Sequence, residues 1–235
     1  QAPDKIIIDN KEYDLLNNPL ENYFAKNPEL DPIYGGKIKM FEKYKTEIIP
    51  IPFSTGNYRG YIATFKIENQ ILKLIDIEIQ NIESEKREYI SVFKELFGDK
   101  NVTLNYSGIL VIPTGDFLES ANFGYSYLFT EYRLITINND KEIKSKELSK
   151  DEYLKFKFKQ FTEYKKTNQY KAEIKEYYKN WNGDKKIELS RKNTKGLTKK
   201  EISELKKDYE NPPKIEFAEN FIFLTKNIDF IIIDY

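Results

Sequence analysis

The segment from Gly60 to Ile79 constrains the fold more than any other part of this chain. It reads "GYIATFKI" and then "ILKLIDIEI", and the two runs are joined by the polar residues Glu68-Asn69-Gln70. Runs rich in β-branched and aromatic residues on either side of a short polar turn predict an antiparallel hairpin. Alternate residues of a strand share a face, so we expect two apolar faces, one made of Tyr61, Ala63, Phe65 and Ile67 and the other of Ile71, Ile75, Ile77 and Ile79.

Several other segments have strand character. Residues 5–14, "KIIIDNKEYD", predict a short hairpin that turns at Asp9-Asn10. "VTLNYSGILVIP" predicts a strand up to Pro113, in which Gly108 marks a bulge or a close backbone approach. "YSYLFTEYRLITI" predicts one further strand, which turns at 138–140 into "KEIKSKEL". The terminal "NFIFLTKNIDFIIIDY" predicts a hairpin around Lys226-Asn227.

Helices are indicated by spacing and by capping patterns. Residues 82–97 predict one amphipathic helix that Gly98 ends. Ser149 with Glu152, and Thr198 with Glu201, form capping boxes that predict two helix starts. Between these two starts we expect one long helix, or two helices separated near 167–168, with an end at 182–184. The two prolines at 212–213 end the last helix.

These elements together predict the class α+β. We expect a mainly antiparallel sheet built from hairpins, one mid-chain helix, and a Lys-rich helical segment before a C-terminal hairpin. The 235 residues are interpreted as a single α+β domain, 1–235, in which 148–210 form a helical, Lys-rich subdomain or insertion.

The chain contains no cysteine and no histidine. Their absence removes the thiol nucleophile, the imidazole base and the usual zinc ligands, so we expect neither a metal nor a cofactor. No apolar run approaches the roughly 20 residues of a membrane helix, so no integral membrane segment is expected. The start at Gln1-Ala-Pro-Asp resembles a mature end left by signal-peptide cleavage and predicts a periplasmic or extracellular location. The alternative is a chain trimmed for expression, from a cytoplasmic protein.

Charge is balanced overall but uneven along the chain. Lysine and arginine number 38, as do aspartate and glutamate, whereas residues 141–210 hold 21 basic and 13 acidic residues. Lysines interleaved with aromatic residues superficially suggest a nucleic-acid surface. Acidic residues are also frequent there, and lysines at helical spacing are typical of a solvated face, so no nucleic-acid partner is expected. Trp181, before Asn182-Gly183-Asp184, is an alternative platform for stacking on a sugar.

Arginine is rare in this chain, with 4 residues against 34 lysines. Arg59 and Arg133 therefore mark places where a planar, two-pronged donor is needed. For Arg59 we favour a structural role: a carboxylate or several carbonyls as partners, with the ring of Tyr58 or Tyr61 against the guanidinium. The alternative is a ligand carboxylate or phosphate. The candidate binding residues are Tyr58, Arg59, Tyr61, Arg133 and Trp181, and no catalytic residue is assigned.

The stretch "STGNYRGYIATFKI…LKLIDI" resembles a segment of small uncharacterised bacterial proteins. In these proteins an Arg-Gly-Tyr step leads into an "IATF"-like or "VATW"-like strand. The resemblance implies a bacterial source and a hairpin, and it brings no activity with it.

Three hypotheses of function follow. The first is a non-enzymatic, exported interaction protein that binds a protein or a glycan through an aromatic, charged surface. The second is a carboxylate-dependent hydrolase that uses Asp76 and Glu78, which lie two apart on one strand and would also suit a calcium site. The third is a cytosolic inhibitor or immunity-type partner protein. For residues 138–142, "NNDKE", a turn is favoured over a calcium loop.

Overall fold

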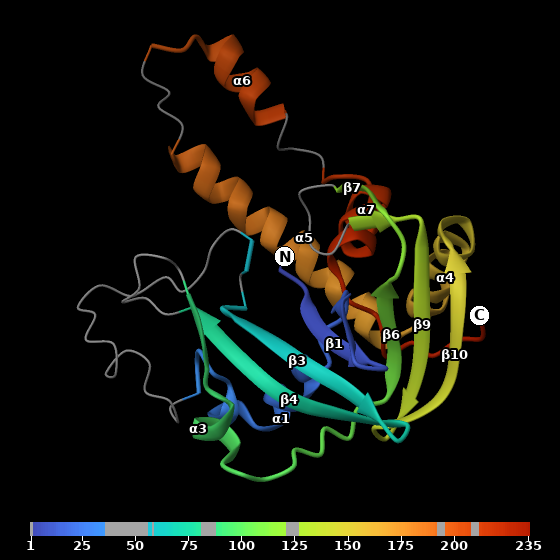
Figure 1. Ribbon diagram of the computed structural model, residues 1–235. Coiled ribbons are helices and arrows are strands. Elements are labelled where there is room, and N and C mark those ends of the chain that lie inside the picture. The colour runs from blue at the N-terminus through green and yellow to red at the C-terminus, as the bar shows by residue number, and fades with distance from the viewer. Residues whose placement is uncertain are drawn as a thin grey trace.

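The structure is a computed structural model that describes residues 2–35, 56–57, 59–80, 88–120, 127–191, 196–207 and 212–235. Figure 1 shows a strongly curved sheet from which a group of helices extends on one side. We call the sheet, with the helices that lie on it, the sheet body, and we call helices α5, α6 and α7 the helical arm. The predicted α+β class with a mainly antiparallel sheet is confirmed.

One large sheet contains eight of the strands in the described part of the chain. Seven follow one another in the order β2-β1-β3-β4-β10-β9-β6, and β5 pairs with β4 beside this path. Strands β1 and β3 pair in parallel, whereas the other pairs are antiparallel. Strands β7 and β8 form a separate antiparallel pair. The bounds are β1 Asp4–Ile8, β2 Lys11–Leu15, β3 Tyr61–Glu68, β4 Ile71–Gln80, β5 Tyr89–Ser91, β6 Gly108–Pro113, β7 Phe117–Ser120, β8 Tyr127–Phe129, β9 Glu131–Asn138 and β10 Lys141–Ser149.

The three hairpin turns predicted around polar residues are confirmed. Each places two successive non-glycine residues at positive φ, which is the geometry of the tight turns that match the twist of a hairpin. The pairs are Asp9 and Asn10 (51° and 62°), Asn69 and Gln70 (52° and 62°), and Asn139 and Asp140 (47° and 64°). Asn and Asp tolerate this conformation better than other side chains do.

A β-bulge in β4 changes the faces that alternation predicts. Thr64 of β3 lies opposite Asp76, but Phe65 lies opposite Leu74, so Ile75 is the extra residue. The bulge shifts the phase of the strand, and Leu72 and Leu74 are therefore buried together with Ile77 and Ile79. The expected apolar face was wrong at Ile71 and Ile75, which are 37% and 38% exposed.

The sheet curls until its two edge strands, β2 and β6, come into contact. The backbone amide of Leu16 donates to the carbonyl of Val111 at 2.9 Å, and the side-chain oxygen of Asn17 accepts from the amide of Val111. This seam encloses the main core. Its largest fully buried members include Ile6, Leu15, Leu20, Phe65, Leu72, Ile77, Ile79, Leu96 and Leu110.

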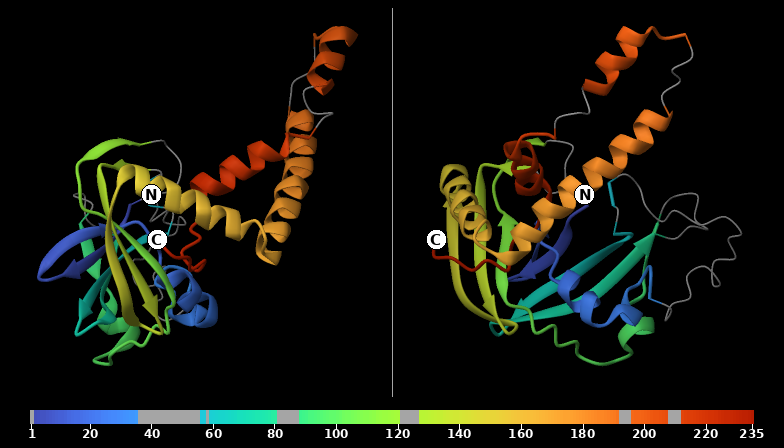
Figure 2. Two further views of the ribbon diagram at one scale, coloured as in Figure 1. Left: turned by 90° about the vertical axis from the view of Figure 1, so that its right-hand side faces the viewer. Right: turned by 180° about the vertical axis from the view of Figure 1, so that it is seen from behind.

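Strand β6 is buried on both faces because α4 (Lys150–Tyr164) covers the outside of the sheet there (Figure 2). Ile109 and Val111 belong to the outer cluster, where the rings of Tyr132 and Tyr153 stack with centroids 3.8 Å apart. Gly108 is a close backbone approach, as expected: a Cβ there would lie 3.1 Å from the carbonyl oxygen of Asp229 and 2.5 Å from the hydroxyl of Tyr106. A side chain at this position would displace the Tyr106 hydroxyl, which donates to Asp229.

The two capping boxes are confirmed, at Ser149 with Glu152 and at Thr198 with Glu201. Between them the chain forms two helices, α4 and α5 (Asn168–Arg191), so the break near 167–168 is confirmed too. The expected helix end at 182–184 is wrong. Gly183 lies within α5, which continues to Arg191. A glycine in the middle of a helix lowers its stability without necessarily ending it. Helix α6 spans Lys199–Lys207.

The predicted helix at 82–97 is confirmed at its end, where α3 (Phe93–Phe97) is helical, and is wrong at 89–91. Residues 89–91 form β5, which pairs with the end of β4. The aromatic and β-branched pair Tyr89-Ile90 suits the edge of that long strand. Gly98 does end the helix, at φ 66°. Residues 81–87 lie outside the described part of the chain.

The predicted C-terminal hairpin is also wrong. Residues 215–225 form helix α7 (Ile215–Thr225), in which Ala218 and Ile222, one turn apart, are buried. The remaining residues form no strand: the amide of Ile231 donates to the carbonyl of Ile228 in a turn, and the carbonyl of Asp229 accepts from the amide of Ile109 of β6 at 2.9 Å. Phe and Ile recur here at both strand and helix spacing, and contact with α5 selects the helix.

Two expected strands are also corrected. The strand before Pro113 begins only at Gly108, and the next is split into β8 and β9. Among the described residues between β2 and β3, two short helical elements are α1 (Leu20–Lys26) and the 3₁₀ turn η1 (Pro28–Leu30).

Candidate functional site

Arg59 is held inside the protein, at the entrance to β3. Its guanidinium donates to the Asp4 carboxylate at 2.7 Å and to the carbonyl of Ala2 at 3.0 Å, and it lies 5.0 Å from the centre of the Tyr61 ring. Asp4 is fully buried and also accepts from the amide of Ala63 at 2.9 Å. Burial raises the pKa of the Asp4 carboxyl, and the charge of Arg59 opposes that shift. The expected contacts of Arg59, a carboxylate, a carbonyl and a tyrosine ring, are confirmed.

The other predicted binding residues are scattered. Arg133, on β9, donates to Ser145 at 2.9 Å and lies 3.8 Å from Glu147, so it bridges β9 and β10. Trp181 lies on α5, in the helical arm. Tyr58 lies outside the described residues. The structure therefore brings only Arg59 and Tyr61 together among the candidates that it describes.

Asp76 and Glu78, the carboxylates of the hydrolase hypothesis, lie together on β4. Asp76 accepts from the hydroxyl of Ser91 at 2.6 Å and from the amide of Ile77 at 2.8 Å. Burial raises the pKa of Glu78, and the negative charges of Asp76 and Glu12 add to the shift. Neither residue lines either of the two clefts described below, one between α5 and α7 and one beside Arg59. Among the described residues, no group of three or more acidic side chains is placed to hold a metal ion.

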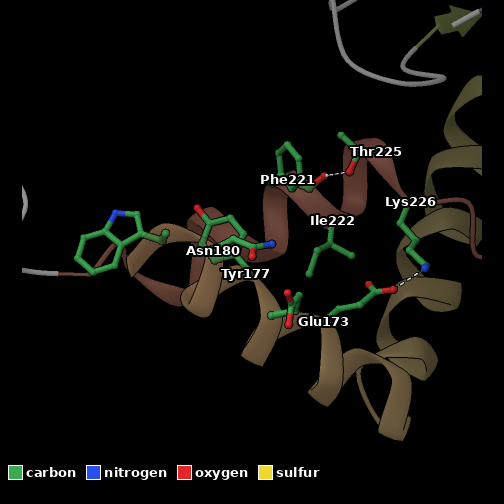
Figure 3. Close-up of a pocket in the computed structure, with 9 residues that line it drawn as sticks. Glu173, Tyr177, Asn180, Phe221, Ile222, Thr225 and Lys226 are labelled. Atoms are coloured by element: carbon green, nitrogen blue, oxygen red, sulfur yellow. Dashed lines mark hydrogen bonds and ion pairs between the residues drawn. The ribbon is translucent and has the colours of Figure 1, made fainter. Parts of the chain in front are cut away.

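A groove with a volume of about 560 Å³ lies between α5 and α7 (Figure 3). The two helices run antiparallel, because Lys226 at the end of α7 meets Glu173 near the start of α5, while Phe221 meets Tyr177 further along. Ile222 points from α7 into the space between them (Figure 3). The lining residues are Glu173, Glu176, Tyr177, Asn180, Trp181, Phe221, Ile222, Thr225 and Lys226.

The base of the groove is fixed by charged and hydroxyl groups. Glu173 forms an ion pair with Lys226 and accepts from the hydroxyl of Tyr164 at 2.5 Å. Next to it, Tyr170 donates to Glu219 at 2.6 Å, and Glu219 also pairs with Lys165. Burial, followed by the hydrogen bond to Glu219, raises the pKa of Tyr170 to about 12. These contacts hold α7 on α4 and α5 and keep the groove in one shape.

The rim of the groove is aromatic and exposed. On α7, Phe221 lines the groove and is 51% exposed. Phe217, one turn earlier on the same face and 69% exposed, continues the rim beyond the lining residues. On α5, Tyr177 and Trp181 have the same spacing, and the rings of Tyr177 and Phe221 lie 6.3 Å apart. Helix α7 thus carries more apolar side chain than its contacts with α5 bury.

Sequence reasoning found one part of this surface and missed the other. Trp181 is a candidate from the sequence, but Phe217 and Phe221 are not. The pattern of residues 220–235 predicts a hairpin, which places Phe221 on a strand and hides its relation to Phe217. Their spacing of four residues was a usable signal, since it places both on one side of a helix.

Within the described residues, no helix has the length and apolar character needed to cross a membrane. Comparison with protein-family models, with curated proteins and with solved structures finds no match for this chain. The resemblance of residues 54–77 to small bacterial proteins therefore stays a prediction.

Proposed function

We propose that this is a non-enzymatic interaction protein, and that a partner protein packs apolar side chains against the aromatic rim of the α5–α7 groove. The observation that carries this proposal is the exposure of Phe217 and Phe221, at 69% and 51%, on a helix that is already anchored by its other face. Rigid exposed aromatic side chains are enriched where proteins bind one another, because they bury much area at small cost in side-chain entropy.

A protein suits the groove better than a glycan does. Binding a sugar requires several free donors and acceptors around an aromatic platform. Here the hydroxyl of Thr225 already donates to the carbonyl of Phe221 at 2.8 Å, and Glu173 is bound by Lys226 and Tyr164. The exposed surface of the groove is mainly apolar, and burying it against apolar side chains of a partner is favourable.

Carboxylate-dependent hydrolysis is less well supported. Asp76 accepts hydrogen bonds from its neighbours Ser91 and Ile77, as a strand residue held in place does. Glycoside hydrolysis needs two carboxyl groups that face one substrate across a cleft. Asp76 and Glu78 line neither the α5–α7 groove nor the cleft beside Arg59.

Site-specific photo-crosslinking in the source cells tests the proposal. A benzoylphenylalanine placed at position 217 should form a covalent adduct with one protein species, identified by mass spectrometry. The matched control is the same probe at position 117, since Phe117 is a similarly exposed phenylalanine, at 56%, on β7. Adding Phe221→Ser to the position-217 probe should reduce the adduct at least several-fold, because half of the aromatic rim of α7 is lost.

Equal adducts from positions 217 and 117 would mean that the groove selects nothing and would refute the proposal. Saccharide binding that depends on Trp181 and survives Phe217→Ser would replace the protein partner by a glycan. The compartment of the cross-linked protein also decides between the two remaining hypotheses. A periplasmic or surface protein supports an exported binding protein, and a cytosolic enzyme or toxin supports an inhibitor or immunity-type protein.

A further inference from the structure

A second cleft lies beside Arg59, in the sheet body, and it shares no lining residue with the α5–α7 groove. It has a volume of about 540 Å³, within the range of small-ligand pockets. Helix α1, the turn η1 and the start of β3 form its walls. The lining residues are Asn18, Glu21, Phe24, Ala25, Pro28, Asp31, Tyr34, Arg59 and Tyr61.

The arginine in this wall does not make the cleft an anion site. Arg59 donates to the Asp4 carboxylate at 2.7 Å and to the Ala2 carbonyl at 3.0 Å, and its side chain is only 12% exposed. The fully buried Asp4 thus neutralises the arginine, which is the one cation among the described residues that line the cleft. A ligand carboxylate or phosphate would have to compete with a buried ion pair, which is costly to break.

The charges that remain are negative. Glu21 and Asp31 both line the cleft, and within the described residues neither forms an ion pair with a lysine or arginine. The Oδ1 atom of Asp31 accepts from the amides of Ile33 and Tyr34, both at 2.8 Å, which fixes the carboxylate in place. Burial raises the pKa of Tyr61; the charge of Arg59 opposes that shift, and the charges of Asp4 and, to a smaller extent, Asp31 add to it.

The surface between these carboxylates is aromatic and apolar. The rings of Phe24 and Tyr61 meet edge to face with centroids 5.6 Å apart, and Ala25 and Pro28 extend this surface. Tyr34 stands at the mouth, 72% exposed. Aromatic rings attract cations through their faces, and apolar walls accept the methylene stem of an amine.

We infer that this cleft binds an alkylammonium group, with the ammonium between Glu21 and Asp31 and the alkyl stem along Phe24 and Pro28. The same chemistry is present in a lysine side chain of a partner and in a free polyamine. The inference is independent of the proposed function, because it concerns a different face and a different kind of ligand.

Calorimetric titration of the full chain with two probes tests the inference and separates the two sources. One probe is spermidine, and the other is a capped Gly-Lys-Gly tripeptide; the same tripeptide with norleucine in place of lysine is the uncharged control. We expect binding of at least one ammonium probe and none of the norleucine peptide. Preference for spermidine assigns a free polyamine, and preference for the lysine peptide assigns a protein side chain.

Three variants locate the site. Glu21→Gln and Asp31→Asn each remove one charge, and Asp31→Asn keeps the acceptor that Ile33 and Tyr34 require. Each should weaken ammonium binding about threefold, and the double variant about tenfold, as for partly exposed ion pairs. Glu29→Gln is the matched control, because Glu29 is an acid of the neighbouring turn η1 that does not line the cleft.

Several results would overturn the inference. These are no heat of binding with either ammonium probe at millimolar concentration, equal binding of the norleucine peptide, or an affinity that Glu29→Gln lowers as much as Glu21→Gln does. Circular dichroism of each variant, unchanged from that of the original chain, shows that the loss comes from the site and not from unfolding.

Discussion

The sheet body and the helical arm differ in how much interior they offer to aromatic residues. The sheet body buries large rings: Phe65 is 0% exposed inside the curled sheet, and Tyr132 of β9 stacks on Tyr153 of α4. The helical arm buries Tyr170 but leaves Phe217 and Phe221 at the surface. A sheet that closes on itself has an inside for its apolar face, whereas two antiparallel helices bury only the stripe along which they touch.

The largest expected difference between the two parts concerns the loss of one phenylalanine from each. Phe65→Ala should cost about 3 to 5 kcal/mol of unfolding free energy, because it opens a cavity in the core. Phe221→Ser should cost about 1 kcal/mol or less, since half of the side chain is solvated. Urea unfolding followed by far-UV circular dichroism measures both. The fluorescence of Trp181, the one tryptophan of the chain, reports separately on the arm.

An equal loss of stability in the two variants would break the comparison. It would mean that the rim of the groove is already covered by the rest of the protein, and it would leave no surface for a partner.

The next prediction concerns the segment that joins α7 to the sheet. Asp229 is buried, accepts from the hydroxyl of Tyr106 at 2.5 Å, and burial raises its pKa from 3.8 to about 6. The folded protein therefore binds a proton at Asp229 in a pH range where the unfolded chain has lost it. Stability from this group is full below about pH 4 and falls as the pH rises through about 6, by about 2 to 3 kcal/mol in all.

Asp229→Asn removes this titration, so its stability should change less between pH 4 and pH 7 than that of the original chain. Urea unfolding at several pH values across that window compares the two slopes. Parallel slopes would show that Asp229 ionises in the folded protein with the pKa that it has in the unfolded chain, and they would contradict the prediction.

The smallest of these effects sharpens the account of the sheet body. Arg59→Lys should cost about 1 to 3 kcal/mol, because an ammonium cannot reproduce the two-pronged contact with Asp4 and Ala2. Arg133→Lys is the matched control and should cost less than about 1 kcal/mol, since its partner Glu147 is 64% exposed. A melting temperature that Arg59→Lys leaves unchanged would contradict a structural role for Arg59.

Local chemistry made part of this fold predictable. Three confirmed features depend only on neighbouring residues. They are the turn pairs such as Asn69-Gln70, the capping box at Ser149, and the separation of two helices near 167–168. The contacts of Arg59 followed from the rarity of arginine and the cost of burying a guanidinium alone.

The features that failed depend on residues far away in the chain. Whether "NFIFL" becomes strand or helix is decided by α5, and whether 89–91 leaves the helix is decided by the free edge of β4. The bulge at Ile75 is a matter of register between two strands, which alternation in one of them does not contain. The sequence does not predict the α5–α7 groove for the same reason: the residues of α7, which form one of its walls, have a pattern that predicts a strand.

The seam between β2 and β6 has a consequence for how the protein reaches this structure. Leu16 must find Val111, and β1 must lie beside β3, which are contacts between positions distant in sequence. Contacts of this kind are slow to form, because a long loop has to close before they return any free energy. During synthesis on a ribosome the hairpin of β1 and β2 emerges long before β6 does, so β2 has no contact with β6 until then. We therefore expect closure of the seam to be a late step of folding, and slowing of folding by substitution of Asn17 to be small compared with the acceleration of unfolding.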